Sequence, residues 1–137
     1  MESKTVLFVD DEANILKSIK RIMFKEPFKT LYANSGAEAL EIAEKNSDIT
    51  VLITDMRMPK MTGLELLREF KKKYPRTVRI VLSGYSHITT LLTAINQGEI
   101  FRYILKPWEN DEELLDAINA AFKHYEAEAN VTADAGS

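Results

Sequence analysis

The sequence contains no cysteine, only four prolines and five glycines, and a single tryptophan. Without cysteine there is no disulfide framework and no thiolate metal site, which fits a reducing compartment. No apolar run approaches the roughly 18–20 residues that span a bilayer. The first residues lead directly into a strand-like run and do not resemble a signal peptide.

An excess of charge of either sign is also missing. The 18 basic residues stand against 21 acidic ones, which gives a formal net charge of −3. This balance offers no overall attraction to nucleic-acid phosphates, so a nucleic-acid partner is disfavoured. We therefore expect a cytoplasmic protein that binds neither membranes nor nucleic acid.

Apolar residues, by contrast, are plentiful. They make up 45% of the 137 residues, which excludes disorder for most of the chain. A chain of this length suits one domain, since it buries roughly 68% of its unfolded surface on folding.

Short apolar runs alternate with segments of helical period, five of each. Strands are predicted at residues 6–9, 28–33, 51–53, 78–82 and 101–105. Capping-box patterns predict helix starts at Ser35, with Glu38, and at Thr62, with Glu65. After about Glu128 the apolar period is lost, so we expect a domain over residues 4–126 and a polar tail or linker over 127–137.

Strict alternation of strands and helices predicts a doubly wound α/β fold with a parallel sheet. In such sheets ligands bind beyond the carboxyl ends of the strands. Four predicted strands end in polar residues, which are Asp10, Asp11 and Glu12, then Asp55, then Ser83, then Lys106.

Each of these residues alone has an ordinary structural interpretation. Asp10 and Asp11 are common helix caps, Asp55 and Ser83 are common turn residues, and Lys106 suits an exposed loop. Together they are harder to explain this way, because two carboxylates 4 Å apart repel by about 4 kcal/mol at an effective dielectric near 20.

A bound cation offsets such repulsion, and an all-oxygen site favours Mg²⁺. An aspartate surrounded by a divalent cation, a lysine and a hydroxyl has what phosphoryl transfer onto its carboxylate requires.

The motifs at the strand ends resemble those of response-regulator receiver domains of two-component signalling, from about Lys4 to His124. They are VDDE at residues 9–12, ITDMRMP at 53–59, TG at 62–63, VLSG at 81–84 and YILKP at 103–107. The resemblance implies a flavodoxin-like sheet of order 2-1-3-4-5 with five helices, and a cis peptide before Pro107.

It also implies the roles of the site residues. Asp55 would be the phosphoacceptor, and Ser83 and Lys106 would contact the phosphoryl group. Mg²⁺ would be held by Asp10, Asp11, Asp55 and the main-chain carbonyl of Arg57.

Further positions follow from the same resemblance. Tyr103 occupies the place of the switch aromatic, which would turn inward when Ser83 moves toward the phosphoryl group; its alternative is a half-buried strand tyrosine. Arg57 and Tyr85 are large residues at positions that tune hydrolysis of the acyl phosphate, and we expect them to slow it.

The implied partners are a sensor histidine kinase or phosphotransfer protein, an output domain or partner protein, and a second copy of the chain through helix four, strand five and helix five. The local sequences around Tyr85 and Trp108 are similar to those of receivers attached to HD-type cyclic-dinucleotide phosphodiesterases. Such a module is not an enzyme, since it catalyses only its own phosphorylation and dephosphorylation.

Other functions fit less well. A flavodoxin-like cofactor binder needs a phosphate-cradling loop where Asp10, Asp11 and Glu12 stand. The P-loop motif is missing, and a dehalogenase-type phosphatase needs an aspartate where Arg57 stands. The remaining alternative is a receiver-fold interaction module that works without phosphorylation.

Overall fold

The computed structural model describes residues 4–46, 48–84 and 88–136. Over these residues the elements are β1 (Thr5–Val9), α1 (Ala13–Met23), β2 (Lys29–Ala33), α2 (Gly36–Lys45), β3 (Val51–Asp55), α3 (Gly63–Lys73), β4 (Val78–Ser83), α4 (Ile88–Asn96), β5 (Arg102–Leu105) and α5 (Asp111–Gly136). The strands form one parallel sheet of order β2-β1-β3-β4-β5. The predicted fold class and strand order are confirmed.

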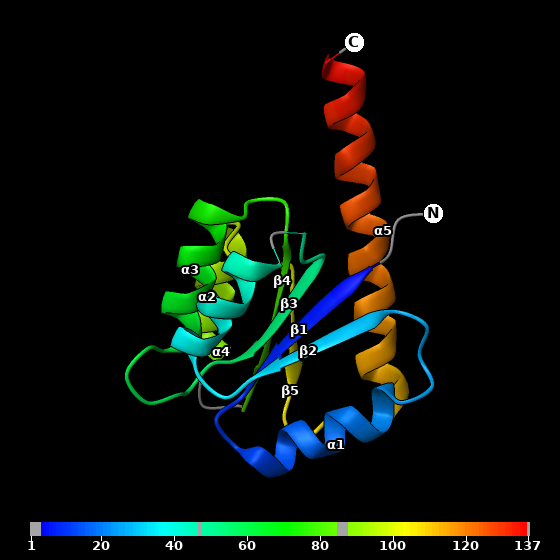
Figure 1. Ribbon diagram of the computed structural model, residues 1–137. Helices are drawn as coiled ribbons and strands as arrows, with labels where there is room; N and C mark the ends of the chain where they lie inside the picture. Colours follow the sequence, from blue (N-terminus) through cyan, green and yellow to red (C-terminus); the bar gives the residue numbers. More distant parts are fainter. Residues whose placement is uncertain (1–3, 47, 85–87, 137) are drawn as a thin grey trace.

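Helices cover both faces of this sheet, with α1 and α5 on one face and α2, α3 and α4 on the other (Figure 1). The central strands β1 and β3 are buried along their whole length. This explains why they are continuous apolar runs and do not alternate with polar residues. Each face has its own core, built around Phe70 on the α3 side and Phe8 on the α1 side.

The strand register brings the polar strand ends to one edge. Asp55 pairs with Leu82 between β3 and β4, and Ser83 pairs with Leu105 between β4 and β5. The backbone N–H of Lys106 donates to the Ser83 carbonyl at 2.9 Å, which continues the ladder past the strand.

The predicted capping boxes form, one of them with a shift. At α3 the Thr62 hydroxyl accepts from the Glu65 N–H, and the Glu65 carboxylate accepts from the Thr62 N–H. At α2 the Ser35 hydroxyl accepts from the Glu38 N–H, but the Glu38 carboxylate accepts from the N–H of Asn34.

The residues expected to form a polar tail or linker, 127–137, are helical as far as Gly136, and the domain boundary at residue 126 stays a prediction. Helix α5 runs for 26 residues to Gly136 and projects beyond the sheet (Figure 1). Four of the ten residues from Ala127 to Gly136 are alanine, the residue with the highest helix propensity. An ion pair between Lys4 and Glu126 ties the helix to the start of β1.

Among the described residues, no helix combines the length and the apolar character needed to cross a membrane.

Candidate functional site

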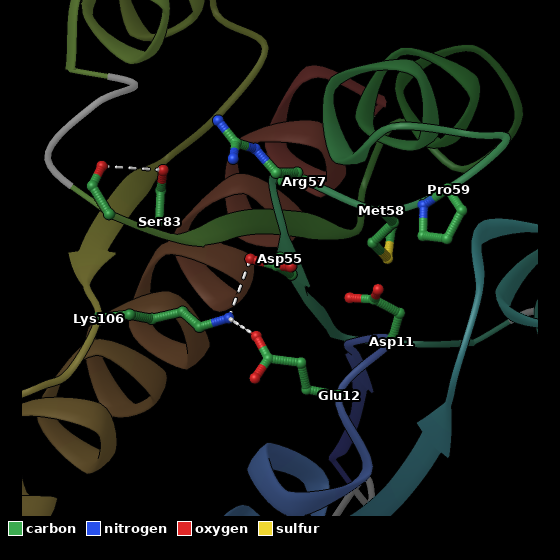
Figure 2. Close-up of a pocket in the computed structure, with 9 residues that line it drawn as sticks. Asp11, Glu12, Asp55, Arg57, Met58, Pro59, Ser83 and Lys106 are labelled. Atoms are coloured by element: carbon green, nitrogen blue, oxygen red, sulfur yellow. Dashed lines mark hydrogen bonds and ion pairs between the residues drawn. The ribbon is translucent and has the colours of Figure 1, made fainter.

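A cleft of about 540 Å³ opens at the carboxyl edge of the sheet, beside the end of β3 (Figure 2). Its floor is Asp55, the last residue of β3, which is only 6% exposed. The lining residues are Asp11, Glu12, Asp55, Arg57, Met58, Pro59, Ser83, Gly84 and Lys106.

Three carboxylates meet at this cleft, as the sequence predicts. Asp10, Asp11 and Asp55 each offer an oxygen within 4.8 Å of the other two. Asp10 is fully buried, Asp55 is buried, and Asp11 is exposed and faces the cleft. These ligand atoms are all oxygens, as Mg²⁺ prefers.

One of the two carboxylate oxygens of Asp10 caps a helix, as the ordinary structural interpretation expects. Asp10 Oδ1 accepts from the backbone N–H of Glu12, at 2.9 Å, at the start of α1. Glu12 itself is the N-cap and its side chain makes no capping bond. The other Asp10 oxygen points to Lys106, so the residue serves both the helix and the cleft.

Lys106 follows directly after β5 and is the positively charged residue that contacts the carboxylates of the cleft. Its Nζ donates to Asp10 Oδ2 at 2.9 Å and to Asp55 Oδ1 at 3.0 Å. A third carboxylate oxygen, Glu12 Oε1, lies 3.9 Å away. The peptide between Lys106 and Pro107 is cis, as the resemblance implied.

Burial raises the pKa of Asp55 above its ordinary value of 3.8. The hydrogen bond and charge of Lys106 lower it, but the charges of Asp10 and Asp11 act with burial. Burial is also the largest effect on Lys106 and lowers its pKa, yet the bonds and charges of Asp10 and Asp55 raise it above the ordinary 10.5. The single positive charge of Lys106 therefore does not balance the negative charges of the neighbouring carboxylates, which favours binding of a further cation.

Ser83 ends β4, next to the strand that Lys106 follows, and is 1% exposed. Its hydroxyl donates to the carbonyl of Gly84 at 3.2 Å. Tyr103 is half-buried in β5, on the sheet face that α4 covers, where Ala94 and Ile95 belong to the same apolar cluster. Both residues lie where the sequence places them.

Of the two residues predicted to tune hydrolysis of the acyl phosphate, the structure describes Arg57 only. Arg57 is exposed, and its side chain stands at the rim of the cleft on the side away from Glu12 (Figure 2). Tyr85 lies outside the described residues.

Two contributors were not identified from the sequence. Glu12 was noted in the acidic run, but its spacing gave no sign that its carboxylate reaches Lys106. Gly63 was noted only as part of a motif. Its N–H donates to the Met56 carbonyl, and a Cβ on Gly63 would lie 2.1 Å from the Asp55 carbonyl oxygen. A glycine directly after a cap residue was the available signal for such a close approach.

Comparison with known proteins gives a consistent result. Residues 6–119 match a family model described as response regulator receiver domain. The hydrogenase transcriptional regulatory protein HoxA of Cupriavidus necator is 38% identical over 117 residues, which are 85% of this chain and 24% of that protein. The chain spans about a quarter of the length of the curated relatives it matches.

Solved structures agree with this result. One described as adenylate cyclase from Rhodopirellula baltica has a TM-score of 0.93 at 31% identity and covers 99% of both chains. The signal receiver domain of an HD domain-containing protein from Pseudomonas fluorescens has a TM-score of 0.86 at 32% identity, covering 95% of this chain and 94% of that one.

Proposed function

The chain belongs to the response-regulator receiver family, and on that premise we propose that it is a phosphoacceptor module switched by phosphorylation of Asp55. The donor is a sensor histidine kinase or a phosphotransfer protein. The observation that carries this proposal is the position of the Asp55 carboxylate, which lies on the floor of an open cleft with the Lys106 ammonium at 3.0 Å.

The chemistry is a displacement at phosphorus. An Asp55 carboxylate oxygen attacks the phosphorus of phosphohistidine, an O–P bond forms and the N–P bond breaks. The imidazole nitrogen keeps the electron pair of the broken bond and takes up a proton. Lys106 stabilises the negative charge on the transferred phosphoryl oxygens, and the Ser83 hydroxyl donates to one of them after leaving the Gly84 carbonyl.

The residues present fit a Mg²⁺ ion. Asp10, Asp11 and Asp55 would supply carboxylate oxygens, and Arg57 would supply its main-chain carbonyl. When bound, the ion offsets the repulsion between these carboxylates and the incoming phosphoryl group. The charge balance described above supports this assignment.

Phosphorylation would act on the surface formed by α4, β5 and α5. Movement of Ser83 toward the phosphoryl group makes room behind it, and Tyr103 turns into that space. The half-buried position of Tyr103 supports this role, since its ring is neither fully exposed nor fully buried in this structure. The remodelled surface then controls an output partner or domain, or pairs with a second copy of the chain.

The output itself is not fixed by the receiver. The relatives reported above are described as a transcriptional regulator, an adenylate cyclase and an HD domain-containing protein. The HD-domain relative is of the kind that the sequence around Trp108 resembles. We propose that the module acts in the cytoplasm and turns over only its own phosphoryl group.

One experiment separates this proposal from a receiver-fold interaction module that works without phosphate. The protein is incubated with acetyl phosphate or phosphoramidate and Mg²⁺, and its intact mass is measured. We expect a gain of one phosphoryl group that is lost in Asp55→Asn. If neither donor produces a gain, the interaction module is the better account.

A further inference from the structure

Glu12 stands at the mouth of the cleft, on the solvent side of Lys106 (Figure 2). Its side chain is 64% exposed, whereas the side chains of Asp10 and Asp55 are 0% and 9% exposed. It is therefore the one carboxylate of the three around Lys106 that can move freely into solvent.

The three carboxylates hold the ammonium in different ways. Asp10 and Asp55 accept hydrogen bonds at 2.9 and 3.0 Å, which occupy two of the three N–H donors of Lys106. Glu12 lies at 3.9 Å, within ion-pair range but beyond hydrogen-bond distance. Glu12 thus holds the ammonium by charge and without a hydrogen bond, and it lines the same cleft that a phosphoryl group has to enter to reach Lys106.

We propose that Glu12 is a positioning residue that makes the cleft selective against small, highly charged phosphoryl donors. This inference rests on the proposed function of Asp55. The Glu12 carboxylate competes with the donor's phosphoryl oxygens for Lys106, and its negative charge opposes the approach of an anion. A donor presented by a protein surface has binding energy from other contacts to overcome this competition, whereas a small donor has none.

The charge of Arg57, on the opposite side of the cleft, limits the effect of Glu12 to one side of it. Arg57 is exposed at the rim on the far side, and its guanidinium attracts the same anions that Glu12 repels. Glu12 therefore sets the approach on the Lys106 side only. Its removal does not affect folding of α1, because its side chain makes no capping bond.

The test compares the wild-type protein, Glu12→Gln and a matched control, Glu44→Gln. Glu44 is exposed on α2 and does not line the cleft, so its variant makes the same change in net charge away from the site. Rates of Asp55 phosphorylation are measured in saturating Mg²⁺ with acetyl phosphate, a dianion at neutral pH, and with phosphoramidate, a monoanion. Acetate or ammonia leaves as the O–P bond to Asp55 forms.

We expect Glu12→Gln to react with acetyl phosphate roughly two- to fivefold faster than the wild type, the range for loss of one partly exposed ion pair. The gain should be smaller with phosphoramidate and should shrink in high salt, which screens the charge. A purely structural role of Glu12 would change both donors equally and would not depend on salt.

Two other outcomes have distinct meanings. If the wild type reacts but Glu12→Gln matches it, or gains no more with acetyl phosphate than Glu44→Gln does, the inference about Glu12 is wrong while the proposed function stands. If the wild type reacts with neither donor, the proposed function is wrong, and the inference about Glu12 is wrong as well.

Discussion

Asp55 is under two opposing demands. For the proposed reaction it has to be ionised, yet its position on the floor of the cleft removes it from water and raises its pKa. Asp10 and Asp11 add to this cost, and Lys106 offsets it only in part. The ionised carboxylate therefore destabilises the metal-free fold.

Asp55→Asn should consequently raise the free energy of unfolding at neutral pH in a buffer with chelator. Because the folded-state pKa is raised, the destabilisation by ionised Asp55 is present above that pKa and disappears as the pH falls through it toward the ordinary value of 3.8. The advantage of the variant should therefore shrink on acidification. Urea unfolding of both proteins over a pH series measures it, and a variant less stable at neutral pH contradicts this description of Asp55.

Arg57 concerns the lifetime of the phosphorylated state. Its exposed side chain stands at the rim of the cleft, and we propose that it shields the acyl phosphate from attack by water. Arg57→Ala should therefore speed decay of the acyl phosphate severalfold, and the sequence alone predicts the same direction for Tyr85→Ala. Loss of the phosphoryl mass over time in excess Mg²⁺ provides the rate, and unchanged decay in both variants rules out the shielding.

The sequence predicts which residues gather at the site better than it predicts which side chains touch one another. Asp10, Asp11, Asp55 and Lys106 could be brought together from the sequence because each follows a strand of one parallel sheet. The contact of Glu12 with Lys106 could not, because the rotamer of a long exposed side chain is set by its surroundings.

Among the elements, the start of α3 determines the shape of the loop after β3. Gly63 approaches the backbone of Asp55 and Met56 so closely that no Cβ fits. The capping box of Thr62 and Glu65 fixes the helix at that point. The loop between them turns through Lys60, whose φ is 69°. The position of Asp55 thus depends on a helix start that takes no part in the proposed chemistry.

Gly63→Ala should cost about 1–3 kcal/mol of stability, the usual range for overpacking a tight site, and should also slow phosphorylation of Asp55. Gly36→Ala is the matched control. There the three nearest atoms belong to the Met61 side chain, with its sulfur at 2.6 Å, whereas at Gly63 they are backbone atoms. Equal losses in the two variants, measured by thermal and urea unfolding, would show that the close backbone approach at Gly63 is unimportant.

The sequence predicts where helices begin better than where they end. Starts were predictable because caps are local, as Ser35 and Thr62 demonstrate. The end of α5 was not, because the apolar period that predicts a helix is lost after about Glu128, although the helix continues to Gly136.

The whole molecule separates the reactive edge from the opposite edge of the sheet. At the opposite edge, the Arg79 guanidinium donates to the carbonyls of Pro75, Thr77, Gly98 and Glu99, which ties β4 to the loops on either side. The sequence did not reveal this network, because no local pattern shows that two loops fold onto one side chain. The carboxyl edge, by contrast, carries the acidic cluster of Asp10, Asp11 and Asp55.

Mg²⁺ should therefore stabilise the whole domain. An ion that binds only the folded state adds RT ln(1 + [L]/Kd), about 2.7 kcal/mol at a hundred times Kd. Asp10→Asn should weaken this response, because it removes one of the three carboxylates. Melting curves over a Mg²⁺ titration provide the comparison, with Ca²⁺-free buffer and constant ionic strength as controls, and a melting temperature independent of Mg²⁺ would count against the metal site.

The central claim is that Asp55 itself becomes phosphorylated. The most direct measurement is to treat the protein with acetyl phosphate and Mg²⁺, reduce it with borohydride and sequence its peptides by mass spectrometry. Borohydride converts an aspartyl phosphate to homoserine and leaves free carboxylates unchanged. We predict homoserine at position 55 and at no other aspartate; an unmodified Asp55, or homoserine at another position, would contradict the account.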